Sequence, residues 1–274
     1  MNPLELVSLT PKSNCGECGY PTCLAFGVAV TKGGVSALGC PHIDRNRLPA
    51  GLAGQATDSG LDKVARGQDE RDMALVAHLK DKVRDLDFAA LAKRLGAAWH
   101  SDRPGELVFA YLGRQVRLGK EQVSMDGWDL VDPRDQILLY NYLAFGGGDT
   151  PRGEWVGMES LPNSISKVRT LDTYCQKRIS ERFAGRPARL AELCRRVDGR
   201  PETGEQSADV ALVVPVLPRV PHLVLFWDED VEDGFAATTK ILFDRQVMDF
   251  LDLESLVFAA ERLADRLAEM DGHE

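Results

Sequence analysis

Apolar residues recur every three or four positions in several stretches of the chain, which predicts amphipathic helices. The longest such stretch covers residues 69–99, and Asp87 is expected to cap its second segment, which runs to Trp99. A capping residue, an early proline or a closing glycine marks most of the others. The predicted helices cover residues 3–9, 21–31, 69–99, 133–145, 163–183, 186–197 and 253–270.

Two other stretches have the pattern of strands. Residues 106–125 contain three short runs separated by Gly-Arg and Gly-Lys, which predicts a small antiparallel meander. Residues 209–227 contain two apolar runs joined through Pro218 and Pro221, and these prolines favour edge positions or a wide turn. Because helices and strands come in blocks, the predicted fold class is α+β with mostly antiparallel strands.

The composition changes after the first helices. Residues 46–68 are rich in glycine, alanine and small polar residues, which is typical of a linker or an irregular wrap. The sequence therefore predicts a small N-terminal domain at residues 1–48, a linker at 49–68 and a larger α+β domain at 69–274.

Composition and charge narrow the classes of function. The chain has 274 residues and a formal charge of −9, so it lacks the basic excess that nucleic-acid binding requires. No apolar run approaches the length of a spanning helix, and the first residues do not resemble a secretion signal. We therefore expect a cytoplasmic protein that does not insert into membranes. In that compartment thiols stay reduced, so clustered cysteines indicate metal binding rather than disulfides.

Four of the six cysteines, Cys15, Cys18, Cys23 and Cys40, follow the spacing C-x2-C-x4-C-x16-C. A [4Fe–4S] cluster needs four thiolates on short loops, and the glycines between the first cysteines let the backbone turn tightly. A zinc site is the alternative, but such sites usually carry two C-x2-C pairs, and this segment has one. We therefore predict a cubane bound by these four cysteines.

The positions of the individual cysteines agree with four cluster ligands and two buried residues. Cys23 is expected in the first turn of the helix that starts at Pro21, where free N–H groups favour a thiolate. Cys40 is followed by proline, as is the last cysteine of bacterial ferredoxin motifs. Cys175 and Cys194 stand apart, on predicted helices, and are expected to be buried apolar residues.

The segment Pro-Lys-Ser-Asn-Cys-Gly-Glu-Cys-Gly-Tyr-Pro-Thr-Cys-Leu-Ala-Phe at residues 11–26 resembles the N-terminal cluster domain of the corrinoid iron–sulfur protein large subunit. Related domains occur in RnfB-type electron-transport subunits. The resemblance covers about residues 3–43 and implies that the four cysteines ligate a low-potential [4Fe–4S] cluster. In the corrinoid protein, such a cluster reductively reactivates cobalt that has drifted from Co(I) to Co(II).

Beyond the linker the chain departs from the corrinoid protein. It is too short for that protein's remaining domains and has no cobalamin-binding Asp-x-His-x-x-Gly, so a corrinoid is expected only in a partner. Residues 70–270 are instead similar to a domain of unknown function found in anaerobes. The expected function is single-electron transfer to or from a partner redox protein, such as a corrinoid protein. The alternatives are a redox enzyme whose active site lies in the α+β domain, and a binding module with a structural metal.

Two further stretches have both a chemical and a structural interpretation. The glycines of Gly146-Gly147-Gly148-Asp149 follow a helix instead of preceding one, so we expect a helix-ending loop and not a phosphate cradle. Residues 228–233 contain five carboxylates in six positions without the spacing of a calcium loop. We expect a solvated turn there, and a docking patch for a basic partner is the alternative.

Overall fold

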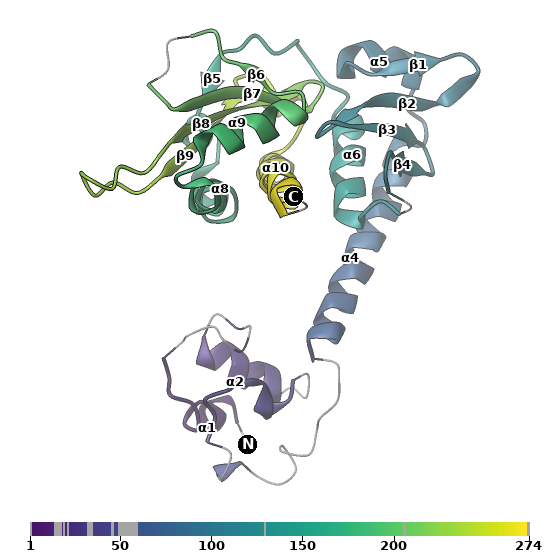
Figure 1. The fold of residues 1–274 in the computed structure, drawn as a ribbon. Helices are drawn as coiled ribbons and strands as arrows, with labels where there is room; N and C mark the ends of the chain where they lie inside the picture. The colour runs from purple at the N-terminus through teal and green to yellow at the C-terminus, as the bar shows by residue number, and fades with distance from the viewer. Residues whose placement is uncertain are drawn as a thin grey trace. The chain divides into compact units, whose positions relative to one another are not determined.

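The structure is a computed structural model, and Figure 1 shows its fold. It describes residues 2–13, 18, 20, 22–31, 35–44, 47–48, 60–128, 130–204 and 207–272. The chain forms two compact units, Met1–Ala74 and Leu75–Glu274. The described residues form helices and two antiparallel sheets, so the predicted α+β class is confirmed.

The first unit contains short helices around a small core. Helix α1 begins with a capping box, in which Asn2 and Glu5 each accept a hydrogen bond from the backbone N–H of the other. Its elements are α1 (Pro3–Val7), α2 (Cys23–Thr31) and the 3₁₀ helix η1 (Ala37–Gly39). The two helices predicted here are confirmed.

Helix α4 (Gly60–Val83) begins before residue 69, where the apolar pattern starts, so the prediction of an irregular chain is wrong for its first turns. The glycines at 60 and 67 make this segment resemble a linker, although Leu61, Val64 and Ala65 already follow helical spacing. Residues 49–59 lie outside the described part of the chain, and the division into domains at 1–48, 49–68 and 69–274 stays a prediction.

Helix α5 (Phe88–Leu95) starts at its predicted cap, where Asp87 accepts hydrogen bonds from two backbone N–H groups. It ends earlier than predicted, because Gly96 adopts a left-handed φ of 67° and terminates it. The last predicted helical residues instead form strand β1 (Ala98–His100).

A four-stranded antiparallel sheet of order β1-β2-β3-β4 follows. The predicted meander is confirmed, and β1 adds a strand to it. The other strands are β2 (Arg103–Tyr111), β3 (Arg114–Gly119) and β4 (Val123–Met125). Alternate residues such as Leu107 and Val116 are fully buried, and helix α6 (Pro133–Phe145) contributes further buried residues to the same core.

A second antiparallel sheet has the order β5-β9-β8-β7-β6. Its strands are β5 (Trp155–Val156), β6 (Arg200–Pro201), β7 (Val210–Leu217), β8 (Val220–Trp227) and β9 (Thr238–Asp244). The edge position and wide turn predicted from the prolines are wrong, because β7 and β8 are interior strands joined by a two-residue turn. Pro215 and Pro221 face each other where the register shifts, so the missing N–H groups coincide at one irregular place in the ladder.

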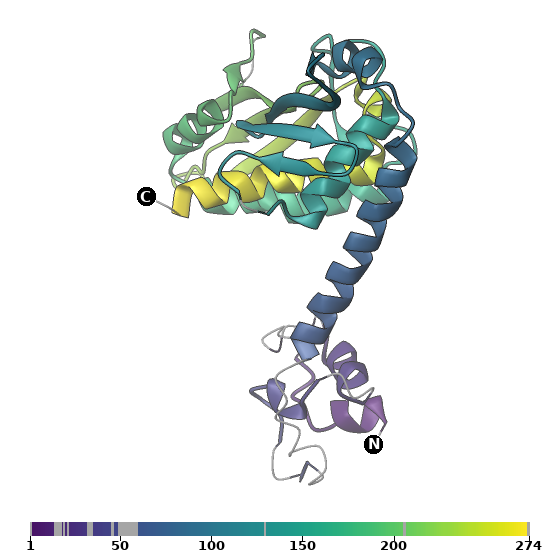
Figure 2. The same ribbon diagram turned by 90° about the vertical axis from the view of Figure 1, so that its right-hand side faces the viewer.

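Helices cover this sheet, and Figure 2 shows α10 running across the domain beside α6. They are α7 (Ile165–Leu171), the π-helical turn η4 (Asp172–Gln176), α8 (Lys177–Phe183), α9 (Pro187–Arg196) and α10 (Leu253–Gly272), with the 3₁₀ turns η3 (Met158–Ser160) and η5 (Val247–Asp249). The side chain of Gln176 accepts a hydrogen bond of 2.9 Å from the N–H of Ile241 in β9. The π-helical turn thus satisfies part of the strand edge that the two-residue β5 leaves uncovered.

Candidate functional site

Helix α2 places Cys23 at its first position. The hydroxyl of Thr22 accepts a hydrogen bond of 3.0 Å from the N–H of Ala25, which caps the helix just before this cysteine. The buried residues of α2 are Cys23, Phe26, Gly27 and Val30, a spacing that forms one stripe along the helix. The predicted place of Cys23 in the first turn is confirmed, and its side chain lies on the buried face.

Cys40 lies at the end of η1 and is only 4% exposed. Ser36 caps this 3₁₀ helix by accepting a hydrogen bond from the N–H of Leu38. A backbone hydrogen bond of 2.9 Å from Asp44 to Leu9 then ties the segment after Cys40 to the end of α1. The fourth cysteine of the motif is thus held beside the first helix, although it is far from it in sequence.

A small apolar core brings these segments together. Cys18 and Cys40 both pack against it, and it consists of Leu6, Leu9, Phe26, Val30, Ala37, Cys40 and Ile43. Phe26 is fully buried, and its ring lies 5.8 Å from the ring of Tyr20, between the second and third cysteines of the motif. Phe26 also lies next to Gly39, where an added Cβ would be 3.7 Å from its ring.

Gly27 allows α1 and α2 to approach closely. A Cβ at this position would lie 2.8 Å from the carbonyl oxygen of Pro3 and 3.1 Å from the side chain of Val7. A larger residue at position 27 would therefore force α1 and α2 apart. The contact fixes α1 against the helix that begins with Cys23.

The donor set has the chemistry of an iron–sulfur site, since all four predicted ligands are cysteines; Cys23 and Cys40 are buried and Cys18 is partly buried. Three of the four predicted ligands lie in one small unit, on separate segments that its core holds together. Cys15 falls outside the described residues. Within the residues that are described, no group of three or more Cys, His, Asp or Glu side chains is arranged as metal ligands. The assignment of Cys15, Cys18, Cys23 and Cys40 as ligands stays a prediction.

The other two cysteines are buried in the second unit, as predicted. Cys175 and Cys194 have no exposed surface. Burial raises the pKa of the Cys194 thiol to about 12 and that of Cys175 further, so both stay protonated at neutral pH. They behave as small apolar residues and offer no reactive thiolate.

The second unit contains a buried ion pair that the sequence interpretation did not find. Asp135, in the first turn of α6, is only 3% exposed and accepts two hydrogen bonds of 2.7 Å from Arg262 on α10. The hydroxyl of Tyr111 donates a third, also of 2.7 Å. Burial and the carboxylate raise the pKa of Tyr111 well above its usual value. The group is fully paired, which indicates a structural role joining β2, α6 and α10. No local pattern indicates this pair, because Asp135 and Arg262 lie 127 positions apart in the sequence.

His222 on β8 is a second buried ionisable residue whose pKa is shifted by burial. It has no exposed surface, its ring meets that of Phe243 edge-on at 4.9 Å, and neither ring nitrogen has a hydrogen-bond partner among the described residues. Burial lowers its pKa from 6.5 to about 4, so the ring is neutral at physiological pH.

The glycine-rich loop after α6 has a structural role. Gly146 ends the helix with a left-handed φ of 69°. A Cβ at Gly147 would collide with the ring of Phe250, and one at Gly148 would collide with the side chain of Asp249. The expectation of a helix-ending loop is confirmed, since close packing against η5 accounts for these glycines.

Comparison with known proteins separates the same two parts of the chain. A family model described as "Putative Fe-S cluster" matches residues 11–42, and one described as "Domain of unknown function (DUF3786)" matches residues 87–266. The first match supports an iron–sulfur cofactor in the N-terminal region. Within the described residues, no helix combines the length and apolar character that a membrane span requires.

Curated relatives match only the N-terminal region. The corrinoid/iron-sulfur protein large subunit of Moorella thermoacetica is 50% identical over 53 residues, which are 18% of this chain and 12% of that protein. The acetyl-CoA decarbonylase/synthase complex subunit gamma of Archaeoglobus fulgidus is 38% identical over 45 residues, or 16% and 10%. Subunit gamma 2 of Methanosarcina mazei is 37% identical over 46 residues, or 17% and 10%.

The chain thus spans only about a tenth of the length of these relatives. The predicted resemblance to the large subunit of the corrinoid iron–sulfur protein is confirmed for this segment. No solved structure matches the chain.

Proposed function

The chain belongs to the family described as Domain of unknown function (DUF3786), and because that family assigns no chemistry, we propose a function from the N-terminal unit: single-electron transfer through a [4Fe–4S] cluster. We infer that Cys15, Cys18, Cys23 and Cys40 are its ligands. When bound, the cluster supplies one-electron redox chemistry. The protein residues hold it, orient it and limit its contact with water.

One observation carries this proposal. The segments that bear Cys18, Cys23 and Cys40 are held together by a single small apolar core, in the region that a cluster family matches. The spacing supports the cubane over zinc, because the motif has one C-x2-C pair instead of two.

The small size of the unit also supports a structural contribution from the cluster. Units of a few tens of residues bury a low fraction of their surface and are commonly stabilised by metals or disulfides. Among the described residues, this core has seven buried members, and one of them is Cys40 itself. We therefore expect that this unit depends on its cluster for stability.

A protein partner fits single-electron transfer, because four thiolate ligands leave no iron open to a substrate. The relatives named above are a subunit of a corrinoid/iron-sulfur protein and subunits of decarbonylase/synthase complexes. We propose that this chain likewise exchanges electrons with a partner redox protein in an anaerobic, reducing cytoplasm, and that a corrinoid protein is the first candidate.

The test is direct electrochemistry followed by transfer to an acceptor. The anaerobically purified chain should show one reversible one-electron wave in the lower part of the range from about −700 to +450 mV. Once reduced, it should convert a Co(II) corrinoid protein to Co(I) with one electron per cluster. A wave without transfer would exclude the corrinoid partner, and the absence of any wave would contradict electron transfer altogether.

A further inference from the structure

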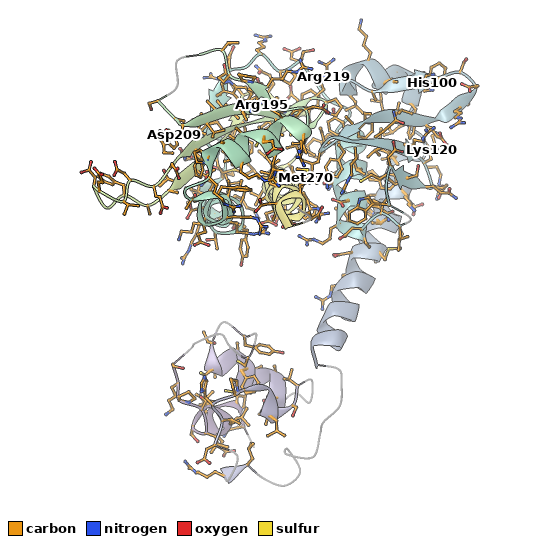
Figure 3. The ribbon with its side chains drawn as sticks, in the orientation of Figure 1. His100, Lys120, Arg195, Asp209, Arg219 and Met270 are labelled. Atoms are coloured by element: carbon orange, nitrogen blue, oxygen red, sulfur yellow. The ribbon has the colours of Figure 1, made fainter. Side chains whose placement is uncertain are left out.

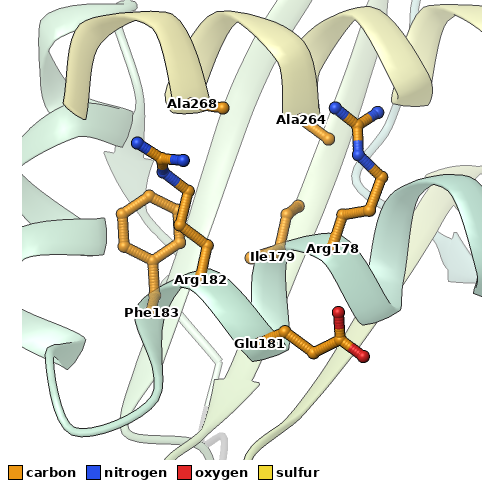
Figure 4. Close-up of a pocket in the computed structure, with 7 residues that line it drawn as sticks. All are labelled: Arg178, Ile179, Glu181, Arg182, Phe183, Ala264 and Ala268. Atoms are coloured by element: carbon orange, nitrogen blue, oxygen red, sulfur yellow. The ribbon is translucent and has the colours of Figure 1, made fainter. Parts of the chain in front are cut away.

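Helices α8 and α10 enclose a hollow of about 320 Å³ between them (Figure 4). Arg178 and Arg182 rise from α8 on its two sides, and Ile179 lies between them, whereas Glu181 points away. The α10 side is formed by Ala264 and Ala268, whose small side chains leave the space open. The hollow thus has an apolar centre with a guanidinium at each side.

Ion pairs hold both guanidinium groups in place but leave some of their hydrogen-bond donors unsatisfied. Arg178 pairs with Asp265 at 2.6 Å and Arg182 with Asp271 at 2.9 Å. Arg182 contacts Asp271 through Nε alone, so within the described residues its two Nη groups have no acceptor. Arg186 binds the same aspartate, so one carboxylate serves several guanidinium groups. The hollow therefore favours an anionic group.

The α8 and α9 side of the hollow has the same sign. Residues 177–196, which include α8 and α9, contain seven lysines and arginines against two glutamates in a chain whose net charge is −9, whereas α10 on the other side carries five acidic residues against two arginines. Figure 3 shows Arg195 on α9 and Met270 in the last turns of α10. This basic surface is an exception on an acidic protein, and opposite charges attract a partner to it.

The size of the hollow limits its occupant. Sites for small molecules and cofactors usually have volumes of about 300–1,000 Å³. At about 320 Å³, this hollow is at the lower limit and suits one large apolar side chain with neighbouring carboxylates.

The hairpin between β8 and β9 carries those groups. Asp230 and Phe235 pair across it through two backbone hydrogen bonds of 2.9 Å, and the carboxylate of Asp230 accepts the N–H groups of Glu232 and Asp233. The turn is thereby fixed before any contact is made, which reduces the entropy cost of binding.

Several side chains of the hairpin contribute to no hydrophobic core and no ion pair in the described part of the chain. Val231 is 81% exposed and Phe235 69% exposed. The carboxylates of Glu229, Glu232 and Asp233 make no ion pair with any described residue. Two large apolar side chains among unpaired carboxylates are unusual for a solvated turn and typical of a docking element.

The hairpin and the hollow are neighbours on the same surface. The carboxylate of Asp228, at the base of the hairpin, accepts a hydrogen bond of 2.7 Å from the N–H of Gly185, two residues beyond α8. If a two-fold axis relates two copies of the chain at this surface, the hairpin of each copy can meet the hollow of the other. We propose that a second copy of this chain inserts its hairpin tip into the hollow, which gives a symmetric dimer.

In this dimer, Val231 and Phe235 cover the apolar centre of the hollow, and the tip carboxylates face Arg178 and Arg182. The apolar contacts hold the dimer, whereas the exposed charges mainly accelerate and direct association and are screened by salt. The dimer should therefore weaken as the ionic strength rises.

Sedimentation equilibrium of the full-length chain, at concentrations up to the order of 0.1 mM and at two salt concentrations, tests this proposal. A dimer is expected, and Ala268→Leu should raise its dissociation constant at least about tenfold because the larger side chain fills the hollow without changing a charge. Glu232→Lys with Asp233→Lys should do the same. The control, Asp85→Lys with Asp102→Lys, makes the same charge change on exposed residues elsewhere and should leave the constant unchanged.

A charge exchange identifies the contact itself. Arg178→Glu alone should weaken the dimer, and combining it with the hairpin lysines should restore at least part of the affinity. Thermal unfolding shows whether each variant is folded before it is compared. A monomer under all conditions would overturn the proposal. So would a dimer that ignores either Ala268→Leu or the hairpin lysines, or one that the exchange does not restore.

Discussion

The two units of this protein differ in what their residues can do chemically. Among the described residues, the first has a core of seven, and its sequence carries four cysteines at cluster spacing. The second has a large core and two sheets, but its buried ionisable residues are either hydrogen-bonded, as Asp135 is to Arg262, or neutral, as His222 is. The candidate cluster ligands therefore lie in the unit with the smaller core. In the unit with the larger core, the described residues offer no reactive group. This contrast predicts that damage to one unit leaves the other intact.

The largest expected effect is the loss of the cluster after a single change in the first unit. Cys18→Ser should remove most of the bound iron, because serine is a poor substitute for a thiolate ligand. Absorbance and iron content of the anaerobically purified variant measure this. Cys175→Ser is the matched control, since the buried Cys175 lies in the other unit and should leave the iron content unchanged. Equal loss of iron in both variants would contradict the conclusion that only the first unit binds the cluster.

A large change in the second unit should have the opposite signature. Phe226 is fully buried in the second sheet, so Phe226→Ala should lower the free energy of unfolding of that unit by about 3–5 kcal/mol. The iron content should not change. Denaturant unfolding followed by circular dichroism gives the first quantity and iron analysis the second. A parallel loss of iron would show that the two units are coupled.

Acid should destabilise the second unit through His222. Its pKa falls from 6.5 in the unfolded chain to about 4 in the folded one, so between these values only the unfolded state takes up the proton. Stability is complete above pH 6.5 and decreases as the pH falls towards 4, by about 3 kcal/mol at most. His222→Leu should remove this part of the pH dependence, measured by unfolding at pH 7 and pH 4.5. An unchanged pH dependence in the variant would assign the acid sensitivity to other groups.

The smallest expected effect comes from the contact between α1 and α2. Gly27→Ala places a methyl group 2.8 Å from the carbonyl oxygen of Pro3, and such overpacking costs about 1–3 kcal/mol. The variant should lose iron to a chelator faster than the wild type, while the unfolding of the second unit stays the same. Leu24→Ala, on the half-exposed side of the same helix, is the control and should release iron at the wild-type rate.

Patterns that act locally could be read from the sequence. The cap at Asp87, the meander and the helix-ending glycine at Gly146 are set by residues within a few positions of one another. The same holds for the cysteine spacing and for the place of Cys23 in the first turn of α2.

Features that depend on distant partners could not be read in this way. Strand β9 has the apolar residues of a strand, but its edge is completed by Gln176, which is 65 positions away. Asp135 lies in the first turn of a helix, where acidic residues are common, and its local sequence does not indicate the pairing with Arg262, 127 positions later. The prolines suggested an edge because the sequence does not show that Pro215 and Pro221 fall opposite each other. Each of these misses concerns a tertiary contact that overrides a local rule.

The central claim is that the first unit holds a [4Fe–4S] cluster through Cys15, Cys18, Cys23 and Cys40. The most direct measurement is iron and acid-labile sulfide analysis of the anaerobically purified chain, combined with EPR of the reduced protein. The expected result is about four iron and four sulfide per chain and the signal of a reduced cubane, all lost in the Cys18→Ser variant. One zinc per chain with no sulfide would contradict the claim.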